Sequence, residues 1–382
     1  MNKYELHSSE REELYQLYLY AFNRTDSDER RKFFMDRVEY GKVLRIKDQQ
    51  KIVSALYRLP LNLNLRGVQF KMGGIGDVMT YPEAGGHGYA TKLLTEILHN
   101  MYDEGYELSF LAPFAHRYYR RLGYEQVSNK FTYQIETDKV RPFKVQQGNV
   151  TRETLTDGLD KIKKYYVARS GKIERPAWWW HYLTLKNNWE IAFAYDDSQN
   201  FSGYIIYERI SEQMIIHEFD FQTFQAYQQL LDFVFAHASM FKQFIFEDYG
   251  NQYRGNYASE PGLMQVKIEP YMMGRIVNFE KFITKYPFAN DFGTLQLKVE
   301  DDNLAANNRV FGLSQHASKP LKNGLWQLKG KINDLSAIFL GALSLEDAIR
   351  MSRLRVSDVT MNQLQEFSRA LIHHAPSFSD YF

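Results

Sequence analysis

The stretch YPEAGGHGYA at residues 81–90 decides how this sequence is interpreted. It joins an expected strand region at 68–81 to the clearest helix of the chain, at 89–104. Its three glycines let the backbone turn tightly and approach a ligand closely. The helix then begins with unpaired N–H groups and the positive end of its dipole, which suit an anion such as pyrophosphate. Such turns also occur without a ligand, so the motif alone leaves both interpretations open.

A second segment, FAHRYYRRLGYE at 114–125, follows the first and is expected to be a short helix running into a strand. Hydrophobic periodicity and turn residues predict the surrounding elements. Residues 1–140 are expected to form a helix at 8–22, strands at 42–47 and 52–61, further strands over 68–81 that are broken by Gly73, Gly74 and Gly76, a helix at 89–104, a strand at 108–112, a helix near 115–122 and a strand pair near 125–135. Ser9 and Glu12 have the spacing of a capping box at the start of the first helix.

The polar stretch around residues 141–151 is interpreted as a domain boundary, and a block with a similar element order follows it. That block is expected to contain a helix near 152–169, strands at 190–195, 203–210 and 214–221, a helix near 223–238 and a strand near 243–247. It is interpreted as a degenerate duplicate of the first block. The last block is expected to contain helices at 278–284, 344–353 and 360–373 and strands at 293–299, 308–313 and 324–328.

Composition narrows the classes of function. The 382 residues include 47 Lys and Arg against 46 Asp and Glu, a net charge of +1 that offers no global field for nucleic acid or an anionic membrane. Cysteine is absent, which excludes disulfides, zinc–thiolate sites and a cysteine nucleophile. We find no metal-ligand spacing, no apolar run long enough to span a membrane and no signal peptide, and we expect a cytoplasmic protein. Aromatic residues reach 15%, which fits thick cores, a subunit interface or an aromatic substrate cleft.

Taken together, residues 81–90 and 114–125 resemble the GNAT acetyltransferases, and the whole chain is similar to the Eis (enhanced intracellular survival) family of aminoglycoside-type acetyltransferases. This resemblance implies an α+β protein in which tandem GNAT folds precede a sterol-carrier-protein-like domain. The expected domains are 1–144, 145–271 and 272–382. Residues 222–229 contain no glycine, so the second domain is not expected to bind acetyl-CoA.

The resemblance also implies where acetyl-CoA binds. The strand residues Val78, Met79 and Thr80 are expected to pair with the pantetheine arm. The pyrophosphate is expected at Gly85, Gly86, His87, Gly88, Tyr89 and Ala90, mainly on the backbone N–H groups from Gly86 onward. Family members usually carry Arg or Gln where this chain has Gly85. Protonated His87 replaces that charge only in part near pH 7, so we expect weaker acetyl-CoA binding, but not its loss.

Tyr119 falls where the family keeps its general-acid tyrosine, which protonates the departing CoA thiolate. The alternative is that its ring only packs, as we expect for Tyr118. The family's general base is the C-terminal carboxylate, and Phe382 has that place here. Asp77, on the strand just before the pantetheine segment, is the competing base.

Phe22 and Asp26 fall in a segment that lines the substrate side in the family. The sequence therefore predicts an acetyl-CoA-dependent N-acetyltransferase acting on aminoglycoside-like amines or polyamines, without a metal, and the family resemblance implies a hexamer. Two other interpretations stay open. One is a sensor that binds acetyl-CoA or a lipid without turnover, which the Gly85 departure keeps open, and the other is a protein lysine acetyltransferase.

Overall fold

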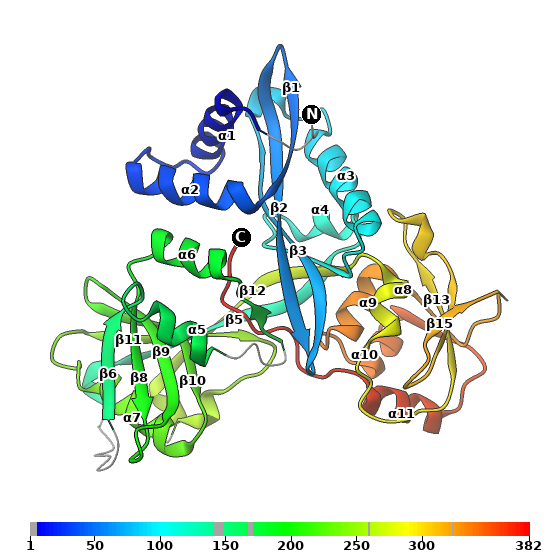
Figure 1. Ribbon diagram of the computed structural model, residues 1–382. Helices are drawn as coiled ribbons and strands as arrows, with labels where there is room; N and C mark the ends of the chain where they lie inside the picture. The colour runs from blue at the N-terminus through cyan, green and yellow to red at the C-terminus, as the bar shows by residue number, and fades with distance from the viewer. Residues whose placement is uncertain (1–5, 141–148, 167–170, 259, 323) are drawn as a thin grey trace. The chain divides into compact units, whose positions relative to one another are not determined.

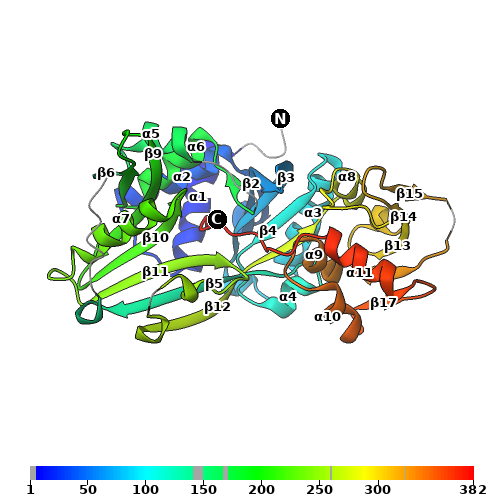
Figure 2. The same ribbon diagram turned by 90° about the horizontal axis from the view of Figure 1, so that it is seen from below.

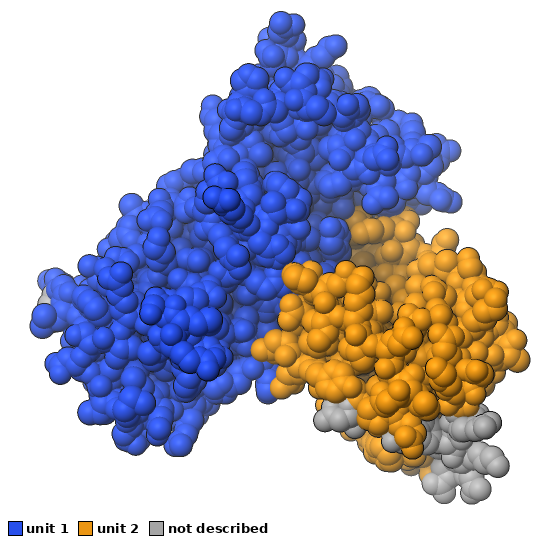
Figure 3. Space-filling view, turned by 180° about the vertical axis from the view of Figure 1, so that it is seen from behind, with its two compact units in different colours: residues 1–128, 168–175, 271–382 blue, residues 129–167, 176–270 orange. Residues whose placement is uncertain are grey.

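The computed structural model describes residues 6–140, 149–166, 171–258, 260–322 and 324–382. The chain divides into two compact units, coloured separately in Figure 3. Unit 1 combines residues 1–128, 168–175 and 271–382, and unit 2 contains residues 129–167 and 176–270. Most of the boundary stretch expected at 141–151 lies outside the described residues, and the predicted domain limits stay predictions.

The N-terminal part of unit 1 builds an open sheet with helices packed against it (Figure 1). Its elements are α1 (Ser8–Ala21), α2 (Asp28–Tyr40), β1 (Lys42–Asp48), β2 (Lys51–Leu65), β3 (Val68–Thr80), α3 (Tyr89–Asp103), β4 (Leu108–Leu111) and α4 (His116–Arg120). The strand order is β1-β2-β3-β4-β12, where β12 is Met264–Ile276, and the short β7 (Ile173–Glu174) pairs with β2. The β3–β4 pair is parallel and the pairs on either side of it are antiparallel.

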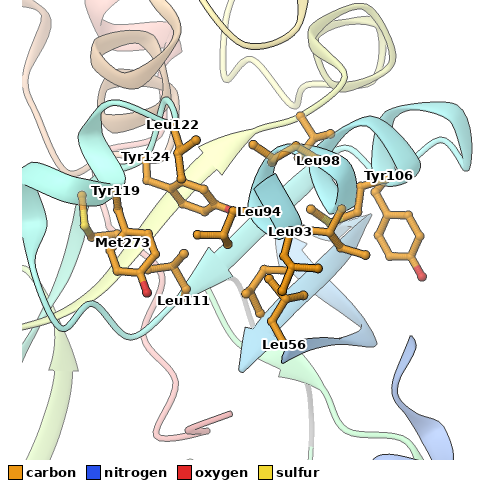
Figure 4. Packing of buried hydrophobic residues seen from close by; sticks show 14 of the residues in the cluster. Leu56, Leu93, Leu94, Leu98, Tyr106, Leu111, Tyr119, Leu122, Tyr124 and Met273 are labelled. Carbon is orange, nitrogen blue, oxygen red and sulfur yellow. The ribbon is translucent and has the colours of Figure 1, made fainter. Parts of the chain in front are cut away.

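A buried apolar cluster holds α3 and α4 against this sheet (Figure 4). The side chains of Leu93, Leu94 and Leu98 project from α3, following the helical spacing of its apolar residues. They pack with Leu56 of β2 and with Tyr119 of α4. Because buried side chains are closely packed, α3 and α4, which carry parts of the candidate site, are held in place against the sheet.

The C-terminal part of unit 1 has its own five-stranded sheet, in the order β15-β14-β13-β16-β17, with helices packed against it (Figure 2). The strands are β13 (Leu295–Glu300), β14 (Val310–Leu313), β15 (Lys319–Leu321), β16 (Leu328–Lys331) and β17 (Leu354–Val356), and the helices are α8 (Phe279–Thr284), α9 (Ile332–Phe339), α10 (Leu345–Arg350) and α11 (Met361–Ala370). Arg275 of β12 (Met264–Ile276) forms a fully buried ion pair with Asp301, at 2.6 Å. Arg275 also donates to the carbonyl oxygen of Leu122, so it joins the N-terminal sheet to the C-terminal part.

Unit 2 repeats the arrangement of a mixed sheet with a helix against it. It contains β6 (Asn149–Thr154), α5 (Leu159–Tyr165), α6 (Ala177–Lys186), β8 (Glu190–Tyr195), β9 (Phe201–Ile210), β10 (Gln213–Phe221), α7 (Phe224–Phe235) and β11 (Gln243–Gly250), together with the later residues of β5 (Glu125–Glu136). Its strand order is β5-β11-β10-β9-β8-β6, and β10 and β11 are parallel. The pair β10–β11 connected through α7 thus has the same form as β3–β4 connected through α3.

The structure corrects several predicted elements. Residues 68–80 form one continuous strand despite their glycines, and 125–136 form one strand rather than a pair. Strand β6 and the short α5 replace the single helix predicted near 152–169. The capping box of α1 uses His7 and Glu10 instead of Ser9 and Glu12, because the helix begins at Ser8. None of the described helices has the length and apolar character that a bilayer crossing requires.

Candidate active site

The glycine-rich turn opens directly onto the N-terminus of α3. Gly86 and Gly88 have φ values of +77° and +73°, in the left-handed region that favours glycine. Gly88 is the N-cap residue, and no side chain caps the helix there. A Cβ atom added to either glycine would have no described atom within 4 Å. Gly86 and Gly88 therefore leave open space beside the first-turn N–H groups of α3, and this arrangement has the form of an anion cradle.

Gly85 and His87 shape the approach to this turn. A Cβ atom on Gly85 would lie 2.9 Å from the carbonyl oxygen of Pro82, which already accepts a 2.9 Å hydrogen bond from the Gly85 N–H. The tight turn thus disfavours any side chain at position 85. The His87 ring stacks on Tyr89, with centroids 5.5 Å apart, and its Nδ1 lies 3.2 Å from the Ala84 carbonyl oxygen. That hydrogen bond fixes an exposed imidazole beside the turn.

Strand β3 leaves its neighbour β4 just before the turn. Parallel pairing runs from Met72–Leu108 to Ile75–Leu111. On its other side, β3 pairs with β2, and a bulge interrupts this pairing. Two β3 residues lie between Gly76 and Met79, whereas only one β2 residue lies between their partners Tyr57 and Ala55. Beyond the bulge, Tyr81 donates to the Val53 carbonyl oxygen. Alternation along an antiparallel pair then turns the N–H and C=O groups of Thr80 away from β2, toward the side that β4 has left.

A buried ion pair fixes this bulge. Asp77 has a φ of +43°, which is unusual for a residue with a side chain. Its carboxylate pairs with Arg37 of α2, and the two side chains are 10% and 5% exposed. The Arg37 guanidinium also lies 4.7 Å from the ring centre of Tyr57. A carboxylate neutralised by a guanidinium has less tendency to accept a proton, so Asp77 is better suited to holding the strand than to acting as a base.

Tyr119 lies almost fully buried in α4, as part of the cluster shown in Figure 4. Its ring lies edge-on to Phe114, Tyr118 and Tyr124, with centroid separations of 5.2, 5.1 and 6.1 Å. Burial, followed by electrostatic effects of neighbouring phenols, raises the pKa of Tyr119 far above its usual range. The phenol therefore keeps its proton at any working pH. Tyr118 differs, because its hydroxyl lies 3.1 Å from that of Thr91 on α3.

The C-terminal residue docks on β3. The Phe382 side chain is buried, and a Cβ atom on Gly74 would meet its ring at 3.0–3.1 Å. Phe382 also stacks with Phe378 (6.4 Å between centroids), whose ring lies edge-on to Phe110 of β4. Glycine at position 74 thus allows this close approach, and a side chain there would require the ring to shift. The chain end thus lies where β3 and β4 still pair, next to the point where they separate.

A set of polar contacts clamps the tail just before its end. Arg175 donates from Nε to Asp380 Oδ1 at 2.7 Å and from Nη2 to Oδ2 at 3.2 Å, and both side chains are buried. The Tyr271 hydroxyl lies 3.0 Å from the Ser379 carbonyl oxygen. The Ser377 N–H donates to the Gly171 carbonyl oxygen at 2.7 Å. The tail is therefore held by side-chain and backbone contacts, and its position does not depend on Phe382 alone.

Tyr381 connects the candidate acid, the competing base and the substrate segment. Its phenol lies within electrostatic range of Tyr119, of Asp77 and of Arg24 in the α1–α2 connection. Tyr381 is 55% exposed, but partial desolvation of its phenol, followed by the charge of Asp77, raises its pKa. The structure thus brings the chain end, α4, the β3 bulge and the α1–α2 connection into one region of unit 1.

The two predicted substrate residues lie on the α1–α2 connection. Phe22 ends α1, is partly exposed and packs on Tyr18, with centroids 5.5 Å apart. The Asp26 carboxylate accepts a 2.7 Å hydrogen bond from the Tyr15 hydroxyl and a 3.1 Å hydrogen bond from Arg31. The Tyr15 hydrogen bond is the largest cause that lowers the pKa of Asp26. Asp26 thus links α1 to α2 through its hydrogen bonds to Tyr15 and Arg31.

Sequence reasoning missed the clamp and the Arg37–Asp77 pair. Their partners are far apart in the chain, Arg175 from Asp380 and Arg37 from Asp77, and no local pattern joins them. One signal was available for the tail, since an apolar chain end that includes an acidic residue suggests docking with a buried cation. Among the described residues, no group of three or more His, Cys, Asp or Glu side chains is placed to hold a metal ion.

The equivalent helix of unit 2 begins differently. The N-cap residue of α7 is Thr223, whose hydroxyl accepts a 3.1 Å hydrogen bond from the Ala226 N–H. A first-turn N–H group that faces open space in α3 is thus satisfied internally in α7. Residues 222–229 also lack the glycines that would bring a ligand close to the backbone.

Comparisons with known proteins fit this geometry. Models of the acetyltransferase (GNAT) domain match residues 4–127 and 171–276, and a sterol carrier protein domain matches 279–379. These matches confirm the predicted α+β fold class, with tandem GNAT folds before a sterol-carrier-protein-like domain. No curated protein matches this sequence.

Solved structures resemble the whole chain. A conserved protein from Enterococcus faecalis V583, described as a probable N-acyltransferase, is 27% identical with a TM-score of 0.92, covering 99% of this chain and 98% of that one. A GCN5-related N-acetyltransferase from Anabaena variabilis is 21% identical with a TM-score of 0.84, covering 98% of each chain. Eis1 from Mycobacterium abscessus is 16% identical with a TM-score of 0.82, covering 100% of this chain and 99% of that one. The last two similarities show the shared fold.

Proposed function

Since the chain is an Eis-like member of the GNAT acetyltransferases, we propose that it moves an acetyl group from acetyl-CoA to a primary amine of an aminoglycoside-like or polyamine substrate. GNAT domains use acetyl-CoA, so the donor follows from the family, whereas the acceptor and the residue roles are our proposal. The observation that carries the residue roles is the docking of Phe382 on Gly74, beside the point where β3 and β4 separate.

The N-terminal GNAT domain fits acetyl-CoA. The backbone at Gly86 and Gly88 is open to a pyrophosphate, and no side-chain cap competes for the first N–H groups of α3. Thr80 presents its backbone groups on the side where β4 has left, so the segment Val78–Thr80 can pair with the amides of the pantetheine arm. Gly85 removes a cation from the cradle, and we expect binding that depends on backbone N–H groups. The capped α7 supports the prediction that the second GNAT domain binds no acetyl-CoA.

The transfer is a direct attack that leaves no acyl-enzyme. The amine nitrogen forms the new C–N bond while the C–S bond of the thioester breaks and CoA departs as a thiolate. The Phe382 carboxylate accepts the proton that the attacking nitrogen loses, and Tyr119 donates a proton to the thiolate. The raised pKa of Tyr119 makes it a weak acid, but the same apolar surroundings raise the pKa of a buried thiol. The phenol first stabilises the developing thiolate by a hydrogen bond and then donates its proton to it.

The geometry favours Phe382 over Asp77 as the base, because Arg37 neutralises Asp77 whereas the tail clamp and Gly74 hold the chain end beside the point where β3 and β4 separate. Arg24, within electrostatic range of Tyr381, adds a positive charge near the acceptor side. We therefore expect the enzyme to prefer amines with their charges spread apart over compact polycations. The expected hexamer, the cytoplasmic location and the absence of nucleic-acid partners stay predictions.

Thiol release from acetyl-CoA with a panel of aminoglycosides and polyamines tests the proposal. Tyr119→Phe and a chain with one additional C-terminal glycine should both lower kcat, by about 10²–10⁴-fold as general acid–base groups do. The added glycine moves the carboxylate by about 3.5 Å and keeps the Phe382 ring. Turnover unaffected by the glycine would remove Phe382 from the mechanism. No release with any amine, despite measurable CoA binding, would instead favour a sensor.

A further inference from the structure

A separate cavity of about 540 Å³ lies within unit 1, where the end of α4 and the start of β5 meet β16, β17 and the start of α9. Its volume falls within the range of small-molecule sites. The residues that line it include none from 78–90, and neither Tyr119 nor Phe382 belongs to them. The cavity is therefore distinct from the candidate active site.

The lining is charged and mostly basic. Five basic side chains face three acidic ones: Arg120, Lys329, Lys331, Arg353 and Arg355 against Glu125, Glu300 and Asp334. Asn333 and Ser352 add polar groups beside them. These charged groups favour a ligand that carries a compensating negative charge, because they would lose their hydration against a lipid tail.

The three carboxylates are already engaged. Glu125 accepts from Arg120 and from Arg353, each at 2.7 Å. Arg353 also donates to Asp334 at 2.5 Å, so one guanidinium bridges two acidic groups. Burial, and to a smaller extent the charge of Glu125, raises the pKa of Asp334. This part of the wall is close to neutral and held rigidly.

Two basic side chains remain weakly compensated. Arg355 has no ion-pair partner within 4 Å among the residues that the structure describes. Lys331 lies opposite Glu300 in the strand register, and its ion pair is a long one with Asp302, at 3.8 Å, between two largely exposed side chains. Lys329 is engaged by Glu300 at 2.6 Å. Five basic side chains against three acidic ones leave the lining with an excess of positive charge. Lys331 and Arg355, at the β16–β17 end, act on the Asp334 and Glu300 carboxylates only through longer-range electrostatics.

The strand register places like charges side by side at that end. Lys329 of β16 lies opposite Lys298 of β13 and opposite Arg355 of β17, so three basic side chains share one row and one face of the sheet. Like charges directly opposite in a sheet are destabilising. Glu300, on the same face of β13, offsets one of them. A bound anion would relieve the remaining repulsion.

We propose that this cavity binds a small phosphate-bearing molecule, with Lys331 and Arg355 as its principal charge partners. A guanidinium binds phosphate in a planar, two-pronged geometry, and the ammonium adds a mobile point charge. The volume exceeds what a single phosphate ion occupies, so an organic portion is expected beside Asn333 and Ser352. Arg120, which lines the cavity, follows Tyr119 directly in α4.

Calorimetric titration of the full chain with inorganic phosphate and with ribose 5-phosphate, at ionic strength matched with sodium chloride, tests the proposal. In the double variant Lys331→Gln/Arg355→Gln, binding should weaken at least tenfold, because both charge partners are lost. Both side chains are exposed, so the fold should be preserved. The matched control, Lys319→Gln/Lys322→Gln, removes two exposed lysines of the same domain outside the cavity and should stay within twofold of wild type.

A third variant separates the cavity from the glycine-rich turn, since phosphate can also bind at the N-terminus of α3. Gly88→Val blocks that turn and should leave the cavity unaffected. Tighter binding of ribose 5-phosphate than of phosphate would identify an organic ligand, and equal binding would identify the phosphate group alone. The proposal is overturned if neither probe binds to wild type, if the double variant binds as wild type does, or if only Gly88→Val abolishes binding.

Discussion

Replacing Asp380 by Asn should release the chain end while sparing the core. Arg175 and Asp380 are 2% and 0% exposed, and their shortest contact is 2.7 Å. Removing one partner of a buried ion pair costs about 3–5 kcal/mol, because the remaining charge is left uncompensated. The tail ends only two residues later, so undocking it costs less than unfolding the unit. A penalty of about 3 kcal/mol shifts the docked–undocked equilibrium roughly 150-fold at 1.36 kcal/mol per factor of ten.

We therefore expect Asp380→Asn to lower kcat for acetyl transfer by roughly 10- to 100-fold. The KM for acetyl-CoA should stay near wild type, because the turn at 85–90 lies outside the clamp. Steady-state thiol release gives both constants, and release of Phe382 by carboxypeptidase reports how often the tail is free. The tail of the variant should be digested faster than that of wild type.

The double variant Arg175→Leu/Asp380→Leu is the matched control, because it removes both charges and leaves no buried ion. Replacement of a whole buried pair by apolar residues is often close to neutral for stability, so kcat should recover at least in part. A variant whose tail is digested quickly but whose kcat equals that of wild type would refute the reasoning. The terminal carboxylate would then have no part in proton transfer, and the clamp would be structural.

Three further results are expected. Gly88→Val should raise the Kd for CoA, measured by calorimetry, at least tenfold, because a β-branched residue at a φ of +73° is strained by about 1–2 kcal/mol and fills the open cradle. Tyr119→Phe should lower kcat without moving the alkaline limb of the kcat–pH profile, since a phenol with such a raised pKa does not titrate there. A limb that disappears in the variant would contradict this. Burial alone would raise the pKa of Glu10, but hydrogen bonds led by Lys47 lower it to about 2. The ionised Glu10 carboxylate therefore stabilises the fold above about pH 4.5. Chemical denaturation should show that the free energy of unfolding falls by about 2–3 kcal/mol as pH falls toward 2. Glu10→Gln should flatten that dependence.

Local patterns were sufficient for elements with strong periodicity. Helix α3 was predicted at 89–104 and spans Tyr89–Asp103, because its apolar stripe is complete and Gly105 ends it at a φ of +73°. The hairpin of β1 and β2 was also predicted. Strand β3 was expected to break at its glycines, yet pairing on both sides, with β2 and β4, keeps it continuous. Tertiary hydrogen bonds thus override a weak local preference.

The candidate site was predictable only where it is local. The turn at 81–90 and the segment around Tyr119 are short motifs, and the structure places both on the elements expected. The Phe382 position rests on Gly74, more than 300 residues earlier in the chain, and on Arg175, which no motif marks. The charged run at the start of α2 was interpreted as a solvated helix face, but the role of Arg37 was missed, because Arg37 contacts Asp77 only in the folded protein.

The two GNAT domains show how little sequence separates a binding turn from a structural one. Both contain a parallel strand pair joined through a helix, β3–α3–β4 and β10–α7–β11. In the first domain, the N-cap residue is Gly88, so no side chain caps the first N–H groups of α3, and we propose that they bind an anion. In the second, Thr223 satisfies one of those groups internally. A helix cannot use its first N–H groups both for its own cap and for a ligand. The difference at the N-cap therefore supports our proposal that acetyl-CoA binds in the first domain alone.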